Sequence, residues 1–271
     1  MAKFSNICLL LEFQDPLLGA EMVRTQLNAR AIFKLEDLFI ATSCKTIFVT
    51  KKSTESAKLR HPKSQSKIEC IYPGSWEFIG SVDRPGQSKI PETIEFLHLG
   101  TLYGSRNLNN LFAAMDQLRI EKYPYAERIH ITNLGDIYSE HLAEYESRKD
   151  FTLLSPVPRV NALLRAQSAS FLLLVQHTDG RSAETIPYKT YDYFNVGRPV
   201  FAIINNSELE SLIRERGGYV ADSKSVNSIK ETMKLMINDM VNGNSIGNSK
   251  SQEIDIRIQF AKLLDHVHQV K

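Results

Sequence analysis

Two acidic residues enclose a lysine just ahead of an apolar run in the segment "AETIPYKTYDYFNVGRPVFAI". Glu184 and Asp192 are eight positions apart, Lys189 lies between them, and a helical pattern begins in their midst. A carboxylate can accept hydrogen bonds from two neighbouring hydroxyls, such as those of a ribose, whereas a lysine or the free amides of a helix start suit a diphosphate. The alternative is a solvated helix terminus with ordinary charges, and composition alone favours neither interpretation.

A glycine-containing turn, "GTLYGSRN", follows an earlier apolar run and precedes another helical pattern. Gly100 and Gly104 would let the backbone approach a ligand closely, and the helix that follows would aim its partial positive charge at an anion. Arg106 would add a planar fork that matches a phosphate. The spacing is not that of a dinucleotide-binding GxGxxG motif, so the residues alone favour a plain glycine turn.

A third segment, "SPVPRV", again connects an apolar run to a helical pattern. Pro158 stands where a proline belongs in the first turn of a helix, so a simple helix start explains it. A binding role would require the backbone of Val157 or Pro158 to face a planar base.

The three segments are joined by short apolar runs that alternate with amphipathic helices, which is typical of an α/β fold whose parallel sheet is covered on both faces. In the later part of the chain we predict strands at residues 93–99, 128–132, 151–155, 171–175, 199–204 and 218–221. Ligands bind at the carboxyl ends of the strands in such sheets. We therefore expect residues 100–106 and 184–192 to meet at one sheet edge.

The first part of the chain has only about three predicted strands, which is half of a Rossmann-like domain. A connector rich in proline and glycine follows it and marks a boundary. We predict a partial domain over residues 1–78, a linker over 79–92, a complete doubly wound domain over 93–252 and a C-terminal helix over 253–271.

Composition excludes several classes of protein. The 33 basic and 31 acidic residues leave a net charge of +2, which indicates no nucleic-acid partner. The longest apolar run, "FLLLV", is too short to span a bilayer. The three cysteines lack the spacing of metal ligands, so reduced thiols and a cytoplasmic location are expected.

A basic run between residues 45 and 67 carries seven lysines and arginines. A solvated face is the favoured interpretation. The alternative is a patch that attracts anionic lipid headgroups and holds the protein peripherally at the inner face of a membrane.

The segment that opens with Glu184 resembles the donor site of GT-B glycosyltransferases, specifically the large family 4 group. That site has an acidic residue, seven others, a second acidic residue, and a helix that ends in Gly-x-Pro-Val; Asp192 takes the second acidic place, and Tyr188 stands where a subset has serine. "FLHLGTLYGSRNLNNLFAAMDQL" resembles the strand, glycine turn and helix that begin the family's donor domain. There Thr101 replaces an arginine, and Arg106 takes the place of a later lysine.

The resemblance covers residues 93–270, with weaker likeness in "LLLEFQDPLLG" and "KIECIYPGSWEF". It implies the GT-B fold: a complete Rossmann-like nucleotide-sugar-binding domain preceded by a partial Rossmann-like domain on the acceptor side, shortened at its N-terminus.

The resemblance also implies roles for individual residues. Asp192 would bind the donor ribose, Glu184 would face the sugar, and Arg106 with Lys189 would neutralise the departing diphosphate. The nucleobase would stack near Val157 and Pro158. The remaining donor-binding positions implied are Gly100, Thr101, Gly104, Thr185, Ile186, Pro187 and Tyr188.

The implied activity is transfer of a sugar from a nucleotide-sugar to a glycan or lipid-linked acceptor, in surface polysaccharide biosynthesis. Retention of anomeric configuration is expected by analogy. The chain has no Asp-x-Asp motif, so we expect neither a metal nor another cofactor.

Two departures from the family keep an alternative open. Thr101 removes half of the expected phosphate clamp, and the strands that carry the family's acceptor loop are missing. The alternative is a non-catalytic donor-binding subunit, or a remnant of a split or truncated transferase, with a partner chain that supplies the missing strands. A sugar-nucleotide epimerase ranks lower because the acidic and histidine groups that it needs have no matching positions.

Overall fold

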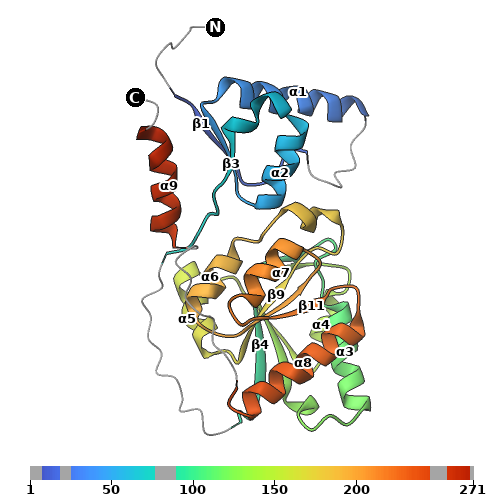
Figure 1. Ribbon diagram of the computed structural model, residues 1–271. Helices are drawn as coiled ribbons and strands as arrows, with labels where there is room; N and C mark the ends of the chain where they lie inside the picture. The colour runs from blue at the N-terminus through green and yellow to red at the C-terminus, as the bar shows by residue number, and fades with distance from the viewer. Residues whose placement is uncertain (1–7, 19–25, 77–89, 245–254, 269–271) are drawn as a thin grey trace. The chain divides into compact units, whose positions relative to one another are not determined.

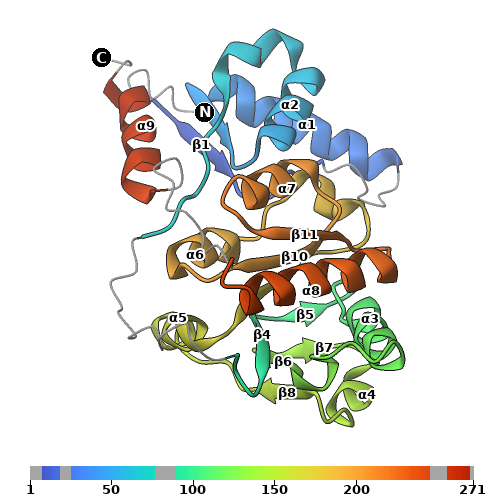
Figure 2. The same cartoon turned by 60° about the horizontal axis from the view of Figure 1, so that its bottom comes forward.

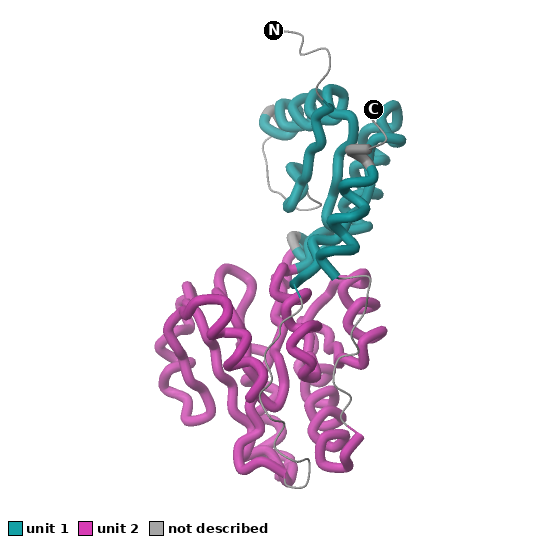
Figure 3. Tube along the Cα trace, turned by 90° about the vertical axis from the view of Figure 1, so that its left-hand side faces the viewer, with its two compact units in different colours: residues 1–76, 180–186, 252–271 teal, residues 77–179, 187–251 magenta. Residues whose placement is uncertain are grey.

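The computed structural model describes residues 8–18, 26–76, 90–244 and 255–268. The chain divides into two compact units, shown in different colours in Figure 3. Unit 1 comprises residues 1–76, 180–186 and 252–271, and unit 2 comprises residues 77–179 and 187–251. Most of the predicted linker, residues 79–92, lies outside the described residues. Each unit is described by itself below.

Unit 2 contains a six-stranded parallel sheet in the order β11-β10-β9-β4-β6-β8 (Figure 1). Its strands are β4 (Ile94–Leu99), β6 (Ile129–Leu134), β8 (Phe151–Leu154), β9 (Phe171–Val175), β10 (Val200–Ile204) and β11 (Tyr219–Asp222). Every residue of β9 and β10 is buried, as expected for central strands covered on both faces. All six correspond to predicted strands.

The strand order places a topological switch between β4 and β9. The chain runs outward through β4, β6 and β8, then returns to the other side of β4 and runs outward through β9, β10 and β11. Phe96 of β4 is in register with Phe171 of β9, and their rings stack with centroids 4.8 Å apart. The carboxyl ends of these two strands are therefore where a doubly wound sheet offers a binding crevice.

Helices α3 (Asn109–Ile120) and α8 (Val226–Val241) pack side by side on one face of this sheet (Figure 2). The apolar stripe of α3 is buried at every position, namely Leu108, Leu111, Phe112, Met115 and Leu118. The two helices form a hydrophobic core with the sheet, and Phe171, Leu173 and Val175 of β9 belong to it. The intervening Leu172 and Leu174 are buried outside that core. This alternation shows that both faces are covered.

The remaining helices of unit 2 are α4 (Leu142–Glu146), α5 (Arg159–Ser168), α6 (Lys189–Val196) and α7 (Ser207–Arg214). A short 3-10 turn, η2 (Ala126–Arg128), precedes β6. Helix α4 is preceded by the two-residue strand β7 (Ile137–Tyr138), which pairs with β5 (Leu102–Tyr103).

Unit 1 contains a three-stranded parallel sheet in the order β1-β2-β3. Its strands are β1 (Leu10–Phe13), β2 (Lys45–Phe48) and β3 (Ile68–Cys70), and they alternate with α1 (Gln26–Thr42), α2 (Lys51–Arg60) and the 3-10 helix η1 (Pro62–Lys67). A small core of Ile40, Phe48, Ala57 and Ile68 joins them. The 3-10 helix η3 (Gly180–Glu184) and helix α9 (Ile256–His268) also belong to unit 1.

A buried ionic cluster fixes α1 against the end of α2. The Glu36 side chain is fully buried and accepts two hydrogen bonds from Arg60, at 2.9 and 3.0 Å. His61 places its two ring nitrogens 2.8 Å from Glu36 and 3.0 Å from Asp37. Paired charges with satisfied hydrogen bonds can stay in the interior, so this cluster has a structural role.

Candidate functional site

Two glycines at the carboxyl ends of neighbouring strands bring the backbone of unit 2 into close contact. Gly100 follows β4 and Gly135 follows β6, with φ of 98° and 140°. A Cβ atom on Gly135 would lie 2.7 Å from the carbonyl carbon and oxygen of Gly100. The short β5–β7 ladder follows directly in the chain. The glycine-rich turn is thus held rigidly over the end of the sheet.

A chain of buried hydrogen bonds runs beneath this turn. Asn133 donates from Nδ2 to the Gly135 carbonyl over 2.7 Å, and its Oδ1 lies 2.6 Å from Nδ1 of His98. His98 and Asn133 are directly opposed in the β4–β6 ladder, and both side chains are fully buried. Because an amide oxygen only accepts, Nδ1 of His98 carries the proton and Nε2 of the neutral ring is an acceptor.

Lys189, the first residue of α6, completes the chain. Its Nζ atom donates to the carbonyl of Leu99 over 2.6 Å and lies 2.8 Å from Nε2 of His98. It also lies 3.5 Å from the position that a Cβ on Gly100 would occupy. The residue as a whole is only half-buried, but its amine is enclosed by protein atoms. The segment around Lys189 and the turn at Gly100 therefore meet at one sheet edge.

The electrostatics of this edge disfavour additional positive charge. Burial holds the pKa of Lys189 well below its ordinary value, and the nearby Arg106 guanidinium lowers it further. Burial likewise holds the pKa of His98 well below its ordinary value, with Lys189 adding to the effect. In the part of the chain that the structure describes, Lys189 has no carboxylate contact. A nearby negative charge would raise the pKa of Lys189.

Arg106 is part of a second polar cluster at the switch point. Its guanidinium carbon lies 5.3 Å from the ring centroid of Tyr103. The preceding residue, Ser105, donates to Oδ2 of Asp179 over 2.6 Å and lies 3.1 Å from Nδ1 of His177. Since the one hydroxyl proton goes to Asp179, Nδ1 of His177 is the donor to Ser105. These contacts tie the glycine-rich turn to the loop that follows β9.

Asp192 forms an ion pair with Arg159, the first residue of α5. Arg159 binds both carboxylate oxygens, with Nε 3.1 Å from Oδ2 and Nη2 closer still to Oδ1. Asp192 is 21% exposed and Arg159 is 52% exposed, so the pair faces solvent. Val157 and Pro158, directly before Arg159, are also exposed. The structure thus places the segment predicted for the base next to the residue predicted for the ribose.

Glu184 belongs to unit 1. Its backbone carbonyl accepts a hydrogen bond of 2.9 Å from Thr50, and its Oε1 accepts one of 2.5 Å from Ser56 of α2. Its Oε2 atom is buried without a hydrogen-bond partner among the described residues. Thr185 and Ile186 also belong to unit 1, whereas Pro187 and the exposed Tyr188 belong to unit 2. The predicted donor segment is therefore divided between the two units.

Several of these groups were not identified from the sequence, namely His98, Ser105, Asn133, Arg159, His177 and Asp179. One sequence pattern could have indicated some of these groups. The chain contains "HLGTLY" and "NLGDIY", and in each a polar residue, a leucine and a glycine lie at the end of a buried strand. A short apolar pair follows shortly after each glycine. The two copies form β4–β5 and β6–β7 and stand in register. Thr101, which the resemblance places at the position of an arginine, is half-buried between Gly100 and β5.

A hollow of about 310 Å³ extends the carboxyl edge beyond β9. Its lining combines the start of α3, the ends of β9 and β10 and the loops after β9 and β11, and includes Asn107, Asn110, Gln176, Thr178, Ser223 and Lys224. Asn110 donates to the Ser223 carbonyl over 2.8 Å, so part of this polar lining serves the fold.

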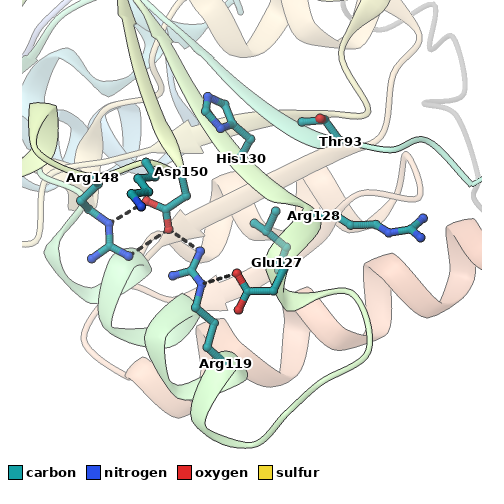
Figure 4. Close-up of a pocket in the computed structure, with 9 residues that line it drawn as sticks. Thr93, Arg119, Glu127, Arg128, His130, Arg148 and Asp150 are labelled. Carbon is teal, nitrogen blue, oxygen red and sulfur yellow. Dashed lines mark hydrogen bonds and ion pairs between the residues drawn. The ribbon is translucent and has the colours of Figure 1, made fainter.

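A second hollow, of about 330 Å³, lies at the opposite, amino-terminal edge of the sheet (Figure 4). Asp150 accepts hydrogen bonds there from Arg148 and Arg119, and Arg119 also approaches Glu127 at 3.7 Å. Arg148 stacks over Phe112 of α3 at 4.5 Å. These charges pair with one another, so the cluster serves to attach α3 to the start of β8.

Several side chains of the basic run in unit 1 form ion pairs or hydrogen bonds within the fold. Lys45 pairs with Glu69, Arg60 with Glu36, and Lys67 donates to two backbone carbonyls at the end of α1. Within the described residues no helix is long and apolar enough to cross a membrane. The same residues contain no group of three or more metal-ligating side chains placed to hold an ion. The three cysteines form no disulfide with one another.

Comparison with known proteins identifies the fold. No family model and no curated protein matches the sequence. Among solved structures, HepE of Anabaena in complex with UDP-glucose is similar with a TM-score of 0.72 at 14% identity, over 97% of this chain and 72% of that one. Sucrose-phosphate synthase of Thermosynechococcus elongatus has a TM-score of 0.65 at 15% identity, over 97% and 68%.

A variant of S. aureus TarM, bound to fondaparinux, alpha-GlcNAc-glycerol and UDP, has a TM-score of 0.65 at 9% identity. That match covers 95% of this chain and 50% of TarM, so the chain spans half the length of that protein. All three neighbours are glycosyltransferases. The present chain has the GT-B fold of these glycosyltransferases, with a six-stranded and a three-stranded parallel sheet.

Proposed function

We propose that the chain is a glycosyltransferase that binds a nucleotide-sugar at the carboxyl edge of the unit 2 sheet. The observation that carries the proposal is Lys189. Its buried amine has no carboxylate contact in the described structure and lies beside the glycine turn at the switch point. A buried ammonium without a counter-charge is costly, so an anionic ligand would favour the charged form of this amine.

The groups along the edge suit the parts of a nucleotide-sugar. Lys189 and Arg106 would neutralise the diphosphate, and Asp192 would accept hydrogen bonds from the ribose hydroxyls. Val157 and Pro158 offer an exposed apolar surface for a base next to Arg159. Gly100, Thr101 and Gly104 would form the backbone wall of the diphosphate site.

Glu184 is the proposed sugar-facing carboxylate, together with the backbone from Thr185 to Tyr188. Its buried Oε2 atom, which has no partner in the described part of the chain, supports a polar ligand there. The proposal includes a metal-independent reaction, because two cationic side chains take the place of a metal at the leaving group. Retention of configuration rests on the family 4 motif alone.

The biological role follows from the same motif. We propose a glycan or lipid-linked acceptor, a place in surface polysaccharide biosynthesis and a cytoplasmic location. Contact with a membrane surface would use the exposed members of the basic run, among them Lys63.

Nucleotide binding is the first test. The full chain is screened by thermal shift against UDP, GDP, ADP and their sugar conjugates, and the best ligand is then measured by calorimetry with and without EDTA. We expect a diphosphate nucleotide to stabilise the chain and EDTA to leave its affinity unchanged. Stabilisation by none of these ligands would refute the proposal.

A second candidate is a donor-binding subunit that transfers no sugar alone. The observation in its favour is β1, which pairs only with β2 among the described strands and so leaves a sheet edge in unit 1. A partner chain could add strands there. Nucleotide binding without hydrolysis or transfer of any bound nucleotide-sugar would favour this candidate, whereas turnover by the purified chain would exclude it.

A further inference from the structure

His98 and Lys189 form a buried pair. Both side chains are neutral in the unliganded protein, and the pair can bind one further proton. The imidazole donates from Nδ1 to Asn133 and offers its Nε2 lone pair to Lys189 over 2.8 Å. The amine has a second acceptor, the Leu99 carbonyl, at 2.6 Å. A neutral amine has two protons, which is enough for both bonds.

A third proton on Nζ would therefore have to point toward a further acceptor. The amine also lies beside Gly100, whose side chain is a single hydrogen atom. Little bulk therefore separates Nζ from the backbone of the glycine turn. Any side chain at residue 100 would lie within van der Waals distance of Nζ. The proposed diphosphate would lie against this glycine turn.

Among the described residues, three charged or titratable groups lie around the amine. They are His98 from β4, Arg106 from the turn before α3, and Tyr193 from α6. Tyr193 accepts from the Leu99 amide over 2.9 Å and donates to the Leu173 carbonyl over 3.2 Å. Burial raises the pKa of this tyrosine, so it stays neutral. None of these groups supplies negative charge at neutral pH.

We propose that binding of a nucleoside diphosphate takes up one proton, which Lys189 holds between Leu99, His98 and the ligand phosphate, with His98 and Asn133 as positioning residues. The inference rests on the proposed function. The proton comes from the acid form of the buffer: the buffer loses a proton, the amine becomes an ammonium, and no covalent bond to the ligand forms. When the diphosphate leaves, the proton returns to solvent.

The direction of the pH dependence follows. Burial and Arg106 hold the pKa of Lys189 down in the free protein, and a bound diphosphate would raise it. Affinity is then greatest below the free-protein value and falls as the pH rises from that value toward the value in the complex. The second pKa of a phosphate is about 6, so above about pH 7.5 the ligand is fully ionised and the proton belongs to the protein.

The experiment is calorimetry of UDP and GDP binding to the full chain in Tris and in HEPES between about pH 7.5 and about pH 9.5, a range chosen above the phosphate pKa. The two buffers release different heats on losing a proton, so the difference in apparent binding enthalpy counts the protons taken up. We expect uptake of up to one proton. Uptake of none, with clear binding, would overturn the inference and leave the proposed function standing.

Variants locate the proton. Lys189→Met should weaken UDP binding by about tenfold to about a hundredfold, the loss of a hydrogen bond to a charged group, and abolish the proton uptake. Lys149→Met makes the same chemical change at an exposed position on the amino edge of the unit 2 sheet and should change neither quantity. Unchanged proton uptake in Lys189→Met would assign the proton elsewhere and refute the inference.

His98 is tested by the position of the pH profile. His98→Leu removes an acceptor of the ammonium, so the fall in affinity should begin at lower pH, whereas His98→Gln keeps an oxygen acceptor and should restore the original profile. A purely structural role for His98 would change affinity without moving the profile. If neither UDP nor GDP binds the unaltered chain, the proposed function and this inference fail together.

Discussion

Gly135 lies so close to Gly100 that a single methyl group on Gly135 would be 2.7 Å from the Gly100 carbonyl carbon. The two glycines end adjacent strands, and Asn133 fixes the second of them through its carbonyl. This contact fixes the turn beside Lys189, so a side chain at residue 135 would displace it.

Gly135→Ala should destabilise unit 2 by about 3 kcal/mol, since it adds an overpacked methyl group to a backbone conformation unfavourable for alanine. Chemical denaturation measures the loss. Gly197→Ala is the matched control, because Gly197 has φ of 78° with nothing within 4 Å of its Cβ position. Strain alone should cost about 1 kcal/mol there. Equal losses in the two variants would show that the Gly100 contact is unimportant.

Asp192→Ala should abolish discrimination between UDP and 2′-deoxy-UDP. The unaltered chain should prefer UDP by about tenfold if the carboxylate binds the ribose, the usual worth of a hydrogen bond to a charged group. Arg159→Met removes the ion pair but keeps the carboxylate, so the preference should persist with lower affinity. A preference that survives Asp192→Ala would remove this residue from the ribose site.

Lys189→Met should flatten the rise of stability with pH. The unfolded lysine has a pKa of about 10.4, and burial holds the folded value well below that. Between the two values the unfolded chain binds more protons, so the unfolding free energy increases with pH. Urea denaturation at a series of pH values from about 7 to about 10 measures the slope across this window. Identical slopes for the variant and the unaltered chain would contradict the assigned pKa shift.

Ser105→Ala should loosen the turn that carries Arg106. The substitution removes the bonds to Asp179 and His177 and leaves both groups to find other partners. A loss of about 1 kcal/mol in the free energy of binding corresponds to about fivefold weaker affinity for UDP. Ser105→Thr keeps the hydroxyl and should retain most of the affinity. Full affinity in Ser105→Ala would show that the β9 loop does not position the turn.

Asp150→Asn should destabilise unit 2 without changing nucleotide affinity, because Asp150 lies at the amino edge of the sheet. Burial tends to raise the pKa of Asp150, but hydrogen bonds from Arg148 and Arg119 outweigh it and leave the pKa lowered. The stability gained by the charged form is therefore present above about pH 4 and is lost as the pH falls through the folded pKa.

Neutralising Asp150 should lower the free energy of unfolding by about 2 kcal/mol at neutral pH. This loss is smaller than that of a fully buried pair, because both arginines are partly exposed. Calorimetry with UDP provides the second measurement. A large change in UDP affinity would mean that the two edges of the sheet are coupled.

The sequence by itself determined the fold class and most of its elements. Runs such as "FLLLV" are apolar at every position because central parallel strands are buried on both faces, and the α3 stripe repeats at helical spacing because only one face is buried. The motif beginning at Glu184 indicated which sheet edge to inspect, since its residue types suit a diphosphate and a ribose whatever their exact positions.

Only the tertiary structure decided which groups meet. His98 and Asn133 are 35 positions apart, and Lys189 is a further 56 beyond Asn133, yet strand register and the start of α6 place them within hydrogen-bonding distance. The division of the motif, with Glu184 in unit 1 and Asp192 in unit 2, was likewise invisible in the spacing. Contacts between distant segments depend on register and packing, which a local pattern of residues does not encode.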